Sequence, residues 1–98
     1  MDRETVLRKL SQHRRQLQSY GIKDIRLFGS VARGEAGAGS DVDLLVEFEP
    51  SAHIGMFEFS RLRRDLSQLL GCEVDLATPD ALHKAIKEDI LREAIRAA

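Results

Sequence analysis

The spacing of hydrophobic positions changes several times along the chain, and the first section has the period of a helix. Over residues 2–20, mainly apolar positions recur at steps of three and four, as on one face of a helix. These positions are Val6, Leu10, His13, Leu17 and Tyr20. Asp2 is a suitable N-terminal cap and Gly21 a suitable end, so we expect one helix over residues 2–20.

The central section has the pattern of strands. Residues 24–29 form a short apolar-rich run that ends in glycine, which predicts a strand, and residues 30–34 leave room for a single helical turn. Residues 40–50 predict the clearest strand of the chain, which Pro50 ends. One face of this strand carries Val42, Leu44, Val46 and Phe48, and the other carries Asp41, Asp43, Leu45 and Glu47.

The C-terminal part returns to a helical period on either side of one short strand. Residues 55–71 predict a helix that Gly71 closes, and residues 73–78 predict a third strand. Thr78 and Pro79 then begin a last helix, with threonine as cap, that is expected to run close to the C-terminus. The apolar positions of the two helices are Phe59, Leu62, Leu66 and Leu69, then Leu82, Ile86, Ile90 and Ala94.

Length and composition agree with one globular domain. The 98 residues are 43% hydrophobic and 32% charged, and the order of elements predicts a single α/β (α+β) domain over residues 1–98. Its small mixed sheet of about three strands is expected to be flanked by helices. The net charge of −1 argues against nucleic acid as the main partner. Because neither a long apolar run nor a secretory leader pattern is visible, we expect a cytoplasmic protein without membrane contact.

Neither the cysteine nor the histidines indicate a reactive or metal site. The single cysteine, Cys72, has mainly apolar neighbours, which predict a small buried side chain rather than a nucleophile. His13, His53 and His83 lie far apart in the sequence, so each is expected at the surface or at an edge, without zinc.

Three aspartates form the first candidate site. Asp41 and Asp43 project from the same side of the predicted strand, about 6.5 Å apart along the backbone, and Asp75 interrupts the third strand. Two like charges ~5 Å apart repel by roughly 3 kcal/mol at an effective dielectric of ~20, so the cluster would favour a cation, and oxygen ligands select Mg²⁺ or Mn²⁺. For the Asp41–Asp43 pair alone, acids pointing into water explain the pattern equally well.

The loop before this strand is the second candidate. Gly29 and Ser30 leave a strand and open a helical turn, where free N–H groups and a hydroxyl suit a phosphate, and Arg33 follows one turn later. The loop matches neither the Walker A pattern nor the dinucleotide-binding glycine pattern. Together, an anion cradle and a carboxylate cluster at neighbouring strand ends fit a metal-bound nucleoside triphosphate.

The whole pattern resembles a known superfamily. Gly29-Ser30, ten residues, Asp41-Val42-Asp43 and the following "LLVEFE" are similar to the nucleotidyltransferase superfamily that contains polymerase-beta-like enzymes. The small size resembles its minimal nucleotidyltransferases, which are typically antitoxins paired with a HEPN-domain RNase toxin. The resemblance extends from Gly21 to the last helix, with no departure at the motif positions.

The resemblance implies a role for each motif residue. Gly29 and Ser30 would hold the β- and γ-phosphates, and the implied nucleotide-binding residues are Gly29, Ser30, Arg33 and Ser40. The implied catalytic and metal-ligating residues are Asp41, Asp43 and Asp75, which would hold two Mg²⁺ ions, with Mn²⁺ as an alternative. Asp75 would also take the proton of the attacking hydroxyl.

Two function classes follow from the resemblance. The first is an adenylyltransferase antitoxin that moves AMP from ATP, or a nucleotide from another triphosphate, to a tyrosine of a HEPN-type toxin, with which it forms a hetero-oligomer. The second is a binding module that neutralises the toxin by complex formation. A sugar-transferring enzyme ranks lower because the chain is short for two substrate sites.

Two further features bear on the acceptor. Tyr20 lies on the apolar face of the first predicted helix, which makes it a poor candidate for self-modification. The arginines at 14–15 and 61–64 are interpreted as solvated helix faces, and an acidic partner is the alternative.

Overall fold

The computed structural model describes residues 2–35, 41–82 and 84–97. Its helices are α1 (Arg3–Gln12), α2 (Arg14–Gln18), α3 (Gly29–Ala32), α4 (Met56–Leu70) and α5 (Lys84–Glu93), with a 3-10 turn at Pro79–Ala81. Its strands are β1 (Ile22–Phe28), β2 (Val42–Phe48), β3 (Val74–Ala77) and β4 (Ile95–Arg96). Ser40 and His83, two residues singled out in the sequence, lie outside the described residues.

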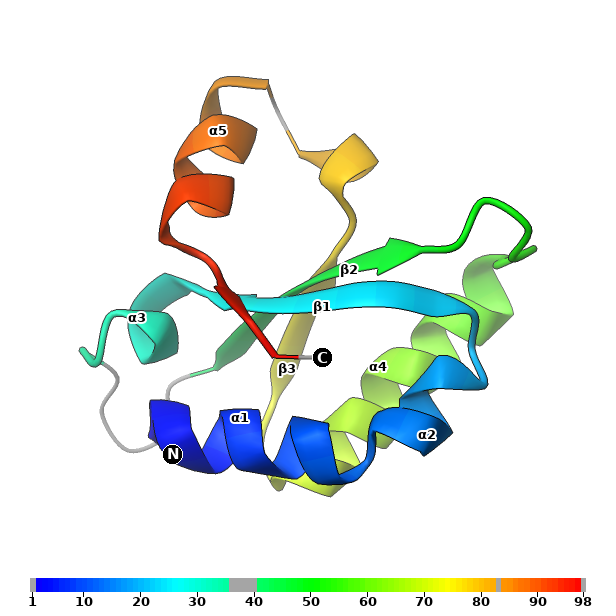
Figure 1. Ribbon diagram of the computed structural model, residues 1–98, viewed down its shortest axis with the longest axis horizontal. Helices are drawn as coiled ribbons and strands as arrows, with labels where there is room; N and C mark the ends of the chain where they lie inside the picture. The colour runs from blue at the N-terminus through cyan, green and yellow to red at the C-terminus, as the bar shows by residue number, and fades with distance from the viewer. Residues whose placement is uncertain (1, 36–40, 83, 98) are drawn as a thin grey trace.

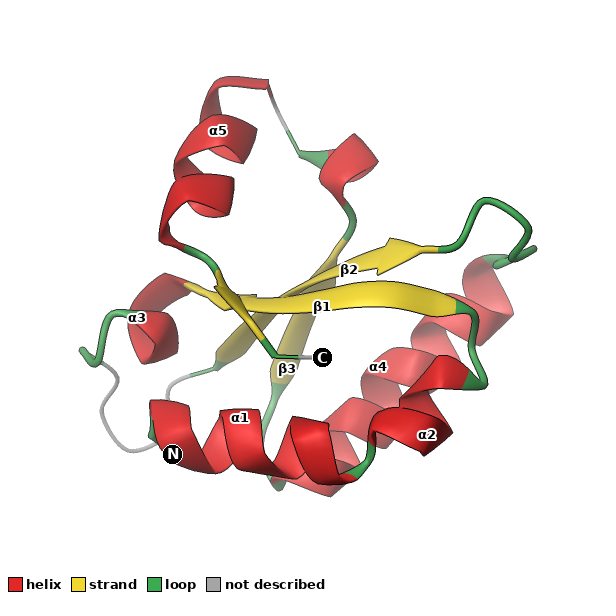
Figure 2. Cartoon of the chain, in the orientation of Figure 1, coloured by secondary structure: helices red, strands yellow, loops and turns green. Residues whose placement is uncertain are grey.

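The strands form one mixed sheet between helices. The order is β3-β2-β1-β4, in which β1 runs antiparallel to both of its neighbours and β2 runs parallel to β3. Helices α1, α2 and α4 lie on one side of the sheet, α5 lies on the other, and α3 follows the end of β1 (Figures 1 and 2). The predicted fold class, a small mixed sheet flanked by helices, is confirmed.

The core lies between the sheet and the layer of α1, α2 and α4. As predicted, Val42, Leu44 and Val46 of β2 point into it, and none of their side-chain surface is exposed. Leu45 on the opposite face is also buried, at 2% exposure. The reason is its central position, because it lies between Arg26 of β1 and Ala77 of β3 and is covered from both sides.

Helix α4 follows its predicted pattern with one change. Leu62, Leu66 and Leu70 are fully buried, whereas Leu69 and Phe59 are only partly buried. A step of four residues from Leu62 through Leu66 keeps the inner stripe on the same face up to Leu70. Gly71 ends the helix in the left-handed conformation, with φ 72°, as predicted.

The N-terminal segment is two helices rather than the single helix predicted. Asp2 caps α1 as expected, because its carboxylate accepts a hydrogen bond from the Thr5 amide at 2.8 Å. His13 then leaves helical geometry, with φ −108° and ψ 22°, and its ring Nδ1 lies 2.9 Å from the Lys9 carbonyl oxygen. A side chain that competes for a helix carbonyl weakens the ladder at that point, and the chain restarts as α2.

The C-terminal segment differs most from its prediction. The expected single helix from Thr78 is a 3-10 turn, a break at Leu82 with ψ 141°, then α5 and the unpredicted strand β4. The Thr78 side chain makes no capping hydrogen bond. Strand β4 pairs with β1, and the Ala97 amide donates to the Ile25 carbonyl at 2.7 Å. The edge of β1 thereby gains backbone partners that a longer α5 would leave unmatched.

None of the helices among the described residues has both the length and the apolar character required to cross a membrane.

Candidate functional site

The strand register brings Asp43 and Asp75 together. They are direct partners in the parallel pair of β2 and β3, and neighbouring strands lie about 4.8 Å apart with paired side chains on the same face. Asp41 lies immediately before β2 and is exposed, while Asp43 is half-buried. The Val42 amide donates to the Glu73 carbonyl at 3.0 Å, which fixes the start of β2 against that of β3. Asp43 and Asp75 therefore meet at one end of the sheet, and Asp41 lies just before the start of β2.

The pKa of Asp43 is raised by its surroundings. Burial, followed by the charge of Asp75, a hydrogen bond with Asp75 and the charge of Asp41, raises the pKa of Asp43 from 3.8 to about 6, and Arg33 opposes the shift. The other two predicted acids, Asp75 and Asp41, thus both act on the Asp43 carboxyl group. A divalent cation at this point would relieve their repulsion.

The donor set fits a metal that is completed by substrate. Among the residues that the structure describes, no three His, Cys, Asp or Glu side chains are gathered closely enough to hold a metal ion. Mg²⁺ is usually bound by one or two carboxylates together with substrate phosphates rather than by an all-protein cage. The opposed pair Asp43 and Asp75 fits that mode of binding, whereas a preformed three-carboxylate cage does not describe the site.

Gly29 joins the carboxylates from the end of β1. Phe28 is the partner of Asp43 in the antiparallel pair of β1 and β2, and Gly29 follows it with φ +78°. A Cβ atom added to Gly29 would lie 2.1 Å from Asp43 Oδ2. Glycine is therefore required here both for its backbone conformation and for its close contact with Asp43.

Arg33 pairs with carboxylates that the sequence analysis did not indicate. Its Nε lies 3.0 Å from Glu35 Oε2, and its Nη1 lies 3.1 Å from Glu93 Oε1. The Gly29 amide donates to the same Glu93 oxygen at 3.2 Å. These partners, Glu35 first, raise the pKa of Arg33 above its usual value. Glu93 is 64 residues from Gly29, and no spacing or motif marks it.

Of the remaining residues named in the sequence analysis, some lie at the site and others do not. Ser30 is half-buried in α3, next to Gly29, so three of the four nucleotide-binding candidates lie together. Ser40, the fourth, is outside the described residues. Cys72 is half-buried against the core, and burial raises the pKa of its thiol, which agrees with a structural role. Tyr20 packs against the core and donates its hydroxyl proton to Asp65.

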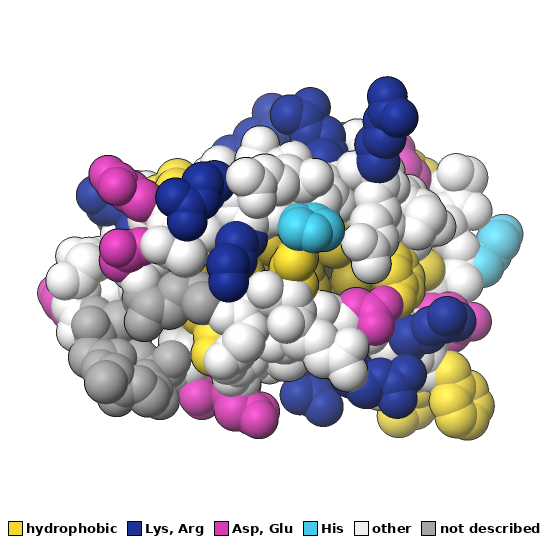
Figure 3. All heavy atoms as spheres, turned by 90° about the horizontal axis from the view of Figure 1, so that it is seen from below, with side chains coloured by type: hydrophobic (Ala, Val, Ile, Leu, Met, Phe, Trp, Pro, Cys, Tyr) yellow, Lys and Arg dark blue, Asp and Glu magenta, His cyan; other side chains and the backbone are white. Residues whose placement is uncertain are grey.

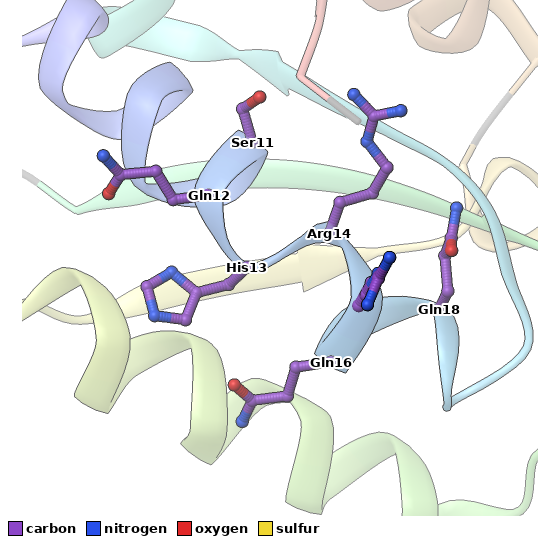
Figure 4. Close-up of a pocket in the computed structure, with 7 residues that line it drawn as sticks. Ser11, Gln12, His13, Arg14, Gln16 and Gln18 are labelled. Atoms are coloured by element: carbon purple, nitrogen blue, oxygen red, sulfur yellow. The ribbon is translucent and has the colours of Figure 1, made fainter.

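A hollow of about 610 Å³ at the break between α1 and α2 is separate from this site. Its lining contains none of the predicted site residues, and the labelled side chains spread outward from the helix junction rather than toward one centre (Figure 4). Lys and Arg side chains surround hydrophobic ones on the helix-covered side (Figure 3). Arg14 and Arg61 are exposed in this helix layer, whereas Asp43 projects from the opposite face of the sheet.

Comparison with known proteins identifies the family. The family model of the nucleotidyltransferase domain matches residues 7–97. The chain belongs to this family. The predicted family and the predicted enzyme class, nucleotidyltransferase, are confirmed.

Individual relatives of this nucleotidyltransferase cover most of its length. The protein adenylyltransferase MntA of Thermococcus cleftensis is 40% identical over 89 residues, which are 88% of this chain and 86% of the relative. A Methanocaldococcus jannaschii protein is 39% identical over 88 residues, 84% of this chain and 88% of its own.

Solved structures share the fold. A structure assigned as a minimal nucleotidyltransferase has a TM-score of 0.82 and 40% identity, and the match covers 97% of this chain and 95% of that one. A MntA–HepT toxin–antitoxin structure has a TM-score of 0.68 at 17% identity, covering 98% of this chain and 72% of that one. The second likeness concerns the fold alone.

Proposed function

We propose that this nucleotidyltransferase is a cytoplasmic, Mg²⁺-dependent antitoxin that transfers AMP from ATP to a tyrosine hydroxyl of a HEPN-type toxin. The observation that carries the proposal is the opposition of Asp43 and Asp75 in adjacent strands, with Gly29 packed against Asp43. The choice of AMP and of a protein acceptor rests on the 40% identical relative named a protein adenylyltransferase. The toxin partner is suggested by the shared fold with MntA–HepT toxin–antitoxin structures.

Donor and metal positions are assigned to this chain's residues. The Gly29 amide, the Ser30 hydroxyl and the Arg33 guanidinium, which lie together at the end of β1, bind the triphosphate. Asp43 and Asp75 hold Mg²⁺, with Asp41 beside them. The chemistry that bound Mg²⁺ supplies is neutralisation of charge on the reacting phosphate and on the leaving pyrophosphate. With its pKa near 6, Asp43 is mainly ionised at neutral pH and is available as a ligand.

The transfer is a single displacement at the α-phosphorus. The tyrosine oxygen forms a bond to the α-phosphorus, and the bond from that phosphorus to the oxygen bridging to the β-phosphate breaks. Pyrophosphate leaves with that bonding electron pair. Asp75 is the exposed member of the Asp43–Asp75 pair. Its carboxylate accepts the proton of the attacking hydroxyl. Fixed strands hold these groups in place, so the rate gain comes from positioning and charge neutralisation.

Stoichiometric binding is the second candidate function. Met56 and Phe57 begin α4 with 86% and 90% of their surface exposed. Adjacent large apolar side chains at such exposure are typical of surfaces that contact a partner. A chain that neutralises its toxin by covering it would use such a surface without any transfer.

One experiment separates these functions. The chain is incubated with its HEPN-type partner, Mg²⁺ and ATP labelled in the adenosine part, and both proteins are analysed by intact mass and by label. We expect label on the partner and none on this chain. The double variant Asp41→Asn, Asp43→Asn should transfer none, and Glu47→Gln, an exposed acid on the same strand, should transfer normally. An unlabelled partner that is still neutralised in a stoichiometric complex would favour the binding function instead.

A further inference from the structure

One side-chain oxygen of the chain lies between two groups of the proposed triphosphate site. Glu93 Oε1 accepts a hydrogen bond from the Gly29 amide at 3.2 Å and another from Arg33 Nη1 at 3.1 Å. Both donors are assigned to phosphate in the proposed function. A carboxylate and a phosphate are both oxygen anions, so they compete for the same donors.

The shared donors cannot easily serve both anions at once. Gly29 has a φ of +78°, and the Asp43 side chain occupies the position that a Cβ atom of residue 29 would take. A backbone amide has one proton to donate, so a phosphate oxygen bound there must replace Glu93. Retaining Glu93 beside a triphosphate would also add a negative charge to a site that already holds Asp43 and Asp75.

The position of Glu93 in the chain allows its side chain to leave Gly29 and Arg33. It is the last residue of α5, a helix without a buried residue, and β4 follows two residues later and pairs with β1. The contact itself is partly exposed, at 45% for the Arg33 side chain and 36% for that of Glu93. Ion pairs at such exposure are weak, so a multivalent anion can replace this one while β4 still holds the end of the chain.

We propose that Glu93 occupies the phosphate position before nucleotide binds and that nucleotide binds by displacing it. This autoinhibitory contact rests on the proposed nucleotide site and deepens it. The other role for Glu93 would be to orient Arg33 for the nucleotide. The hydrogen bond from Gly29 favours displacement, because a backbone amide fixed by its own strand end needs no side chain to orient it.

The test compares three changes at position 93 with one matched control. Glu93→Gln removes the charge, Glu93→Ala removes the contact, and Glu93→Asp keeps the charge but shortens the side chain. Glu88→Gln removes the same charge from an exposed position of the same helix. Dissociation constants are measured by calorimetry for ATP with Mg²⁺ and for inorganic tripolyphosphate, and circular dichroism verifies that each variant is folded.

We expect all three changes at position 93 to tighten both ligands by on the order of three- to fivefold, the upper value for a partly exposed ion pair. The factor should be the same for ATP and tripolyphosphate because the base is not involved. Glu88→Gln should stay within about twofold of the parent, since screened charges at a distance act weakly.

Several results would overturn this inference. Weaker binding by Glu93→Gln and Glu93→Ala would assign Glu93 to orienting Arg33, and unchanged affinities would remove it from the site. If Glu93→Gln and Glu88→Gln tighten binding equally and Glu93→Asp does not, the effect comes from net charge and not from the contact of Glu93. If neither the parent nor any variant binds ATP or tripolyphosphate, the proposed nucleotide site is wrong and the inference is lost with it.

Discussion

The Asp43 carboxylate packs so closely against Gly29 that there is room for a hydrogen atom but not for a methyl group. A Cβ atom at Gly29 would lie 2.1 Å from Asp43 Oδ2, and the glycine has φ +78°. The glycine of the predicted phosphate loop therefore also shapes the carboxylate cluster. The two halves of the site, cradle and acids, are in direct contact.

Replacing Gly29 should consequently damage the fold and not only the affinity for nucleotide. We expect Gly29→Ala to lower the free energy of unfolding by at least about 2 kcal/mol, from backbone strain plus the clash with Asp43. Gly34→Ala is a matched control, because Gly34 has φ +73° but nothing within 4 Å of an added Cβ. Its cost should be about 1 kcal/mol, measured by urea unfolding.

Measuring Gly29→Ala in a chain that also carries Asp43→Ala separates the clash with the carboxylate from the backbone strain. Without the carboxylate, the penalty of Gly29→Ala should fall toward that of Gly34→Ala. If Gly29→Ala and Gly34→Ala lower the free energy of unfolding equally in the parent chain, the close contact with Asp43 does not affect stability.

The raised pKa of Asp43, caused by burial and then by its acidic neighbours, should make stability depend on pH. The folded-state pKa of Asp43, about 6, exceeds its ordinary value of 3.8, so the folded state binds the proton more tightly than the unfolded state. The destabilisation is then full above about pH 6 and disappears as pH falls toward 3.8. Asp43→Asn should stabilise the chain at pH 7.5 by roughly 0.5–1 kcal/mol, since solvent screens a partly exposed group, and should have little effect near pH 4.

Urea midpoints between pH 4 and 8 measure this difference. Glu47→Gln, on an exposed position of the same strand, is the control and should show no such pH dependence. A stabilisation by Asp43→Asn that is equal at all pH values would mean that the ionisation of Asp43 is not its cause.

Much of the scaffold was predictable because its signals are local. The alternation of β2 identifies its buried face, and a cap at Asp2 and a glycine at Gly71 mark helix ends. Strand β4 was not predictable, because the apolar steps of the last helix continue through Ala94 and only the free edge of β1 turns the chain into a strand. The break at His13 likewise depends on one side-chain contact.

The site was predictable in part for the same reason. Gly29, Asp41 and Asp43 lie within a short stretch of sequence with a fixed spacing, and Asp75 interrupts an apolar strand. Their meeting requires the parallel register, which no local pattern contains. Glu93 carries no signal, since it is one of 16 acidic residues and its partner is 64 positions away.

Metal affinity should depend unequally on the three aspartates. Asp43→Asn and Asp75→Asn should each weaken Mn²⁺ binding in the presence of ATP by on the order of tenfold or more, the scale seen for disturbed metal sites. Asp41→Asn should weaken it less, because Asp41 lies before β2, outside the register pair that joins Asp43 to Asp75. Electron paramagnetic resonance of free Mn²⁺ gives the affinities, and equal effects of all three substitutions would contradict this ranking.

Tyr20 should matter for stability and not for transfer. Its hydroxyl donates to Asp65, and its ring packs against the core, so Tyr20→Phe should lower the free energy of unfolding by about 1 kcal/mol. Transfer of label from ATP to the partner should be unchanged. Asp65→Asn, which keeps an acceptor for the hydroxyl, should have a smaller effect on thermal unfolding.

A loss of transfer by Tyr20→Phe without a loss of stability would instead assign the hydroxyl to the reaction.

The parallel pairing of β2 and β3 also orders the steps of folding. The connection between β1 and β2 is residues 29–41, whereas the connection between β2 and β3 is residues 49–73, which include α4. Contacts between distant segments form later than local ones because the closure entropy of the longer loop opposes them. Asp43 therefore meets Asp75 only when β3 docks. The repulsion between Asp43 and Asp75 is therefore absent until β3 docks, and it opposes that docking.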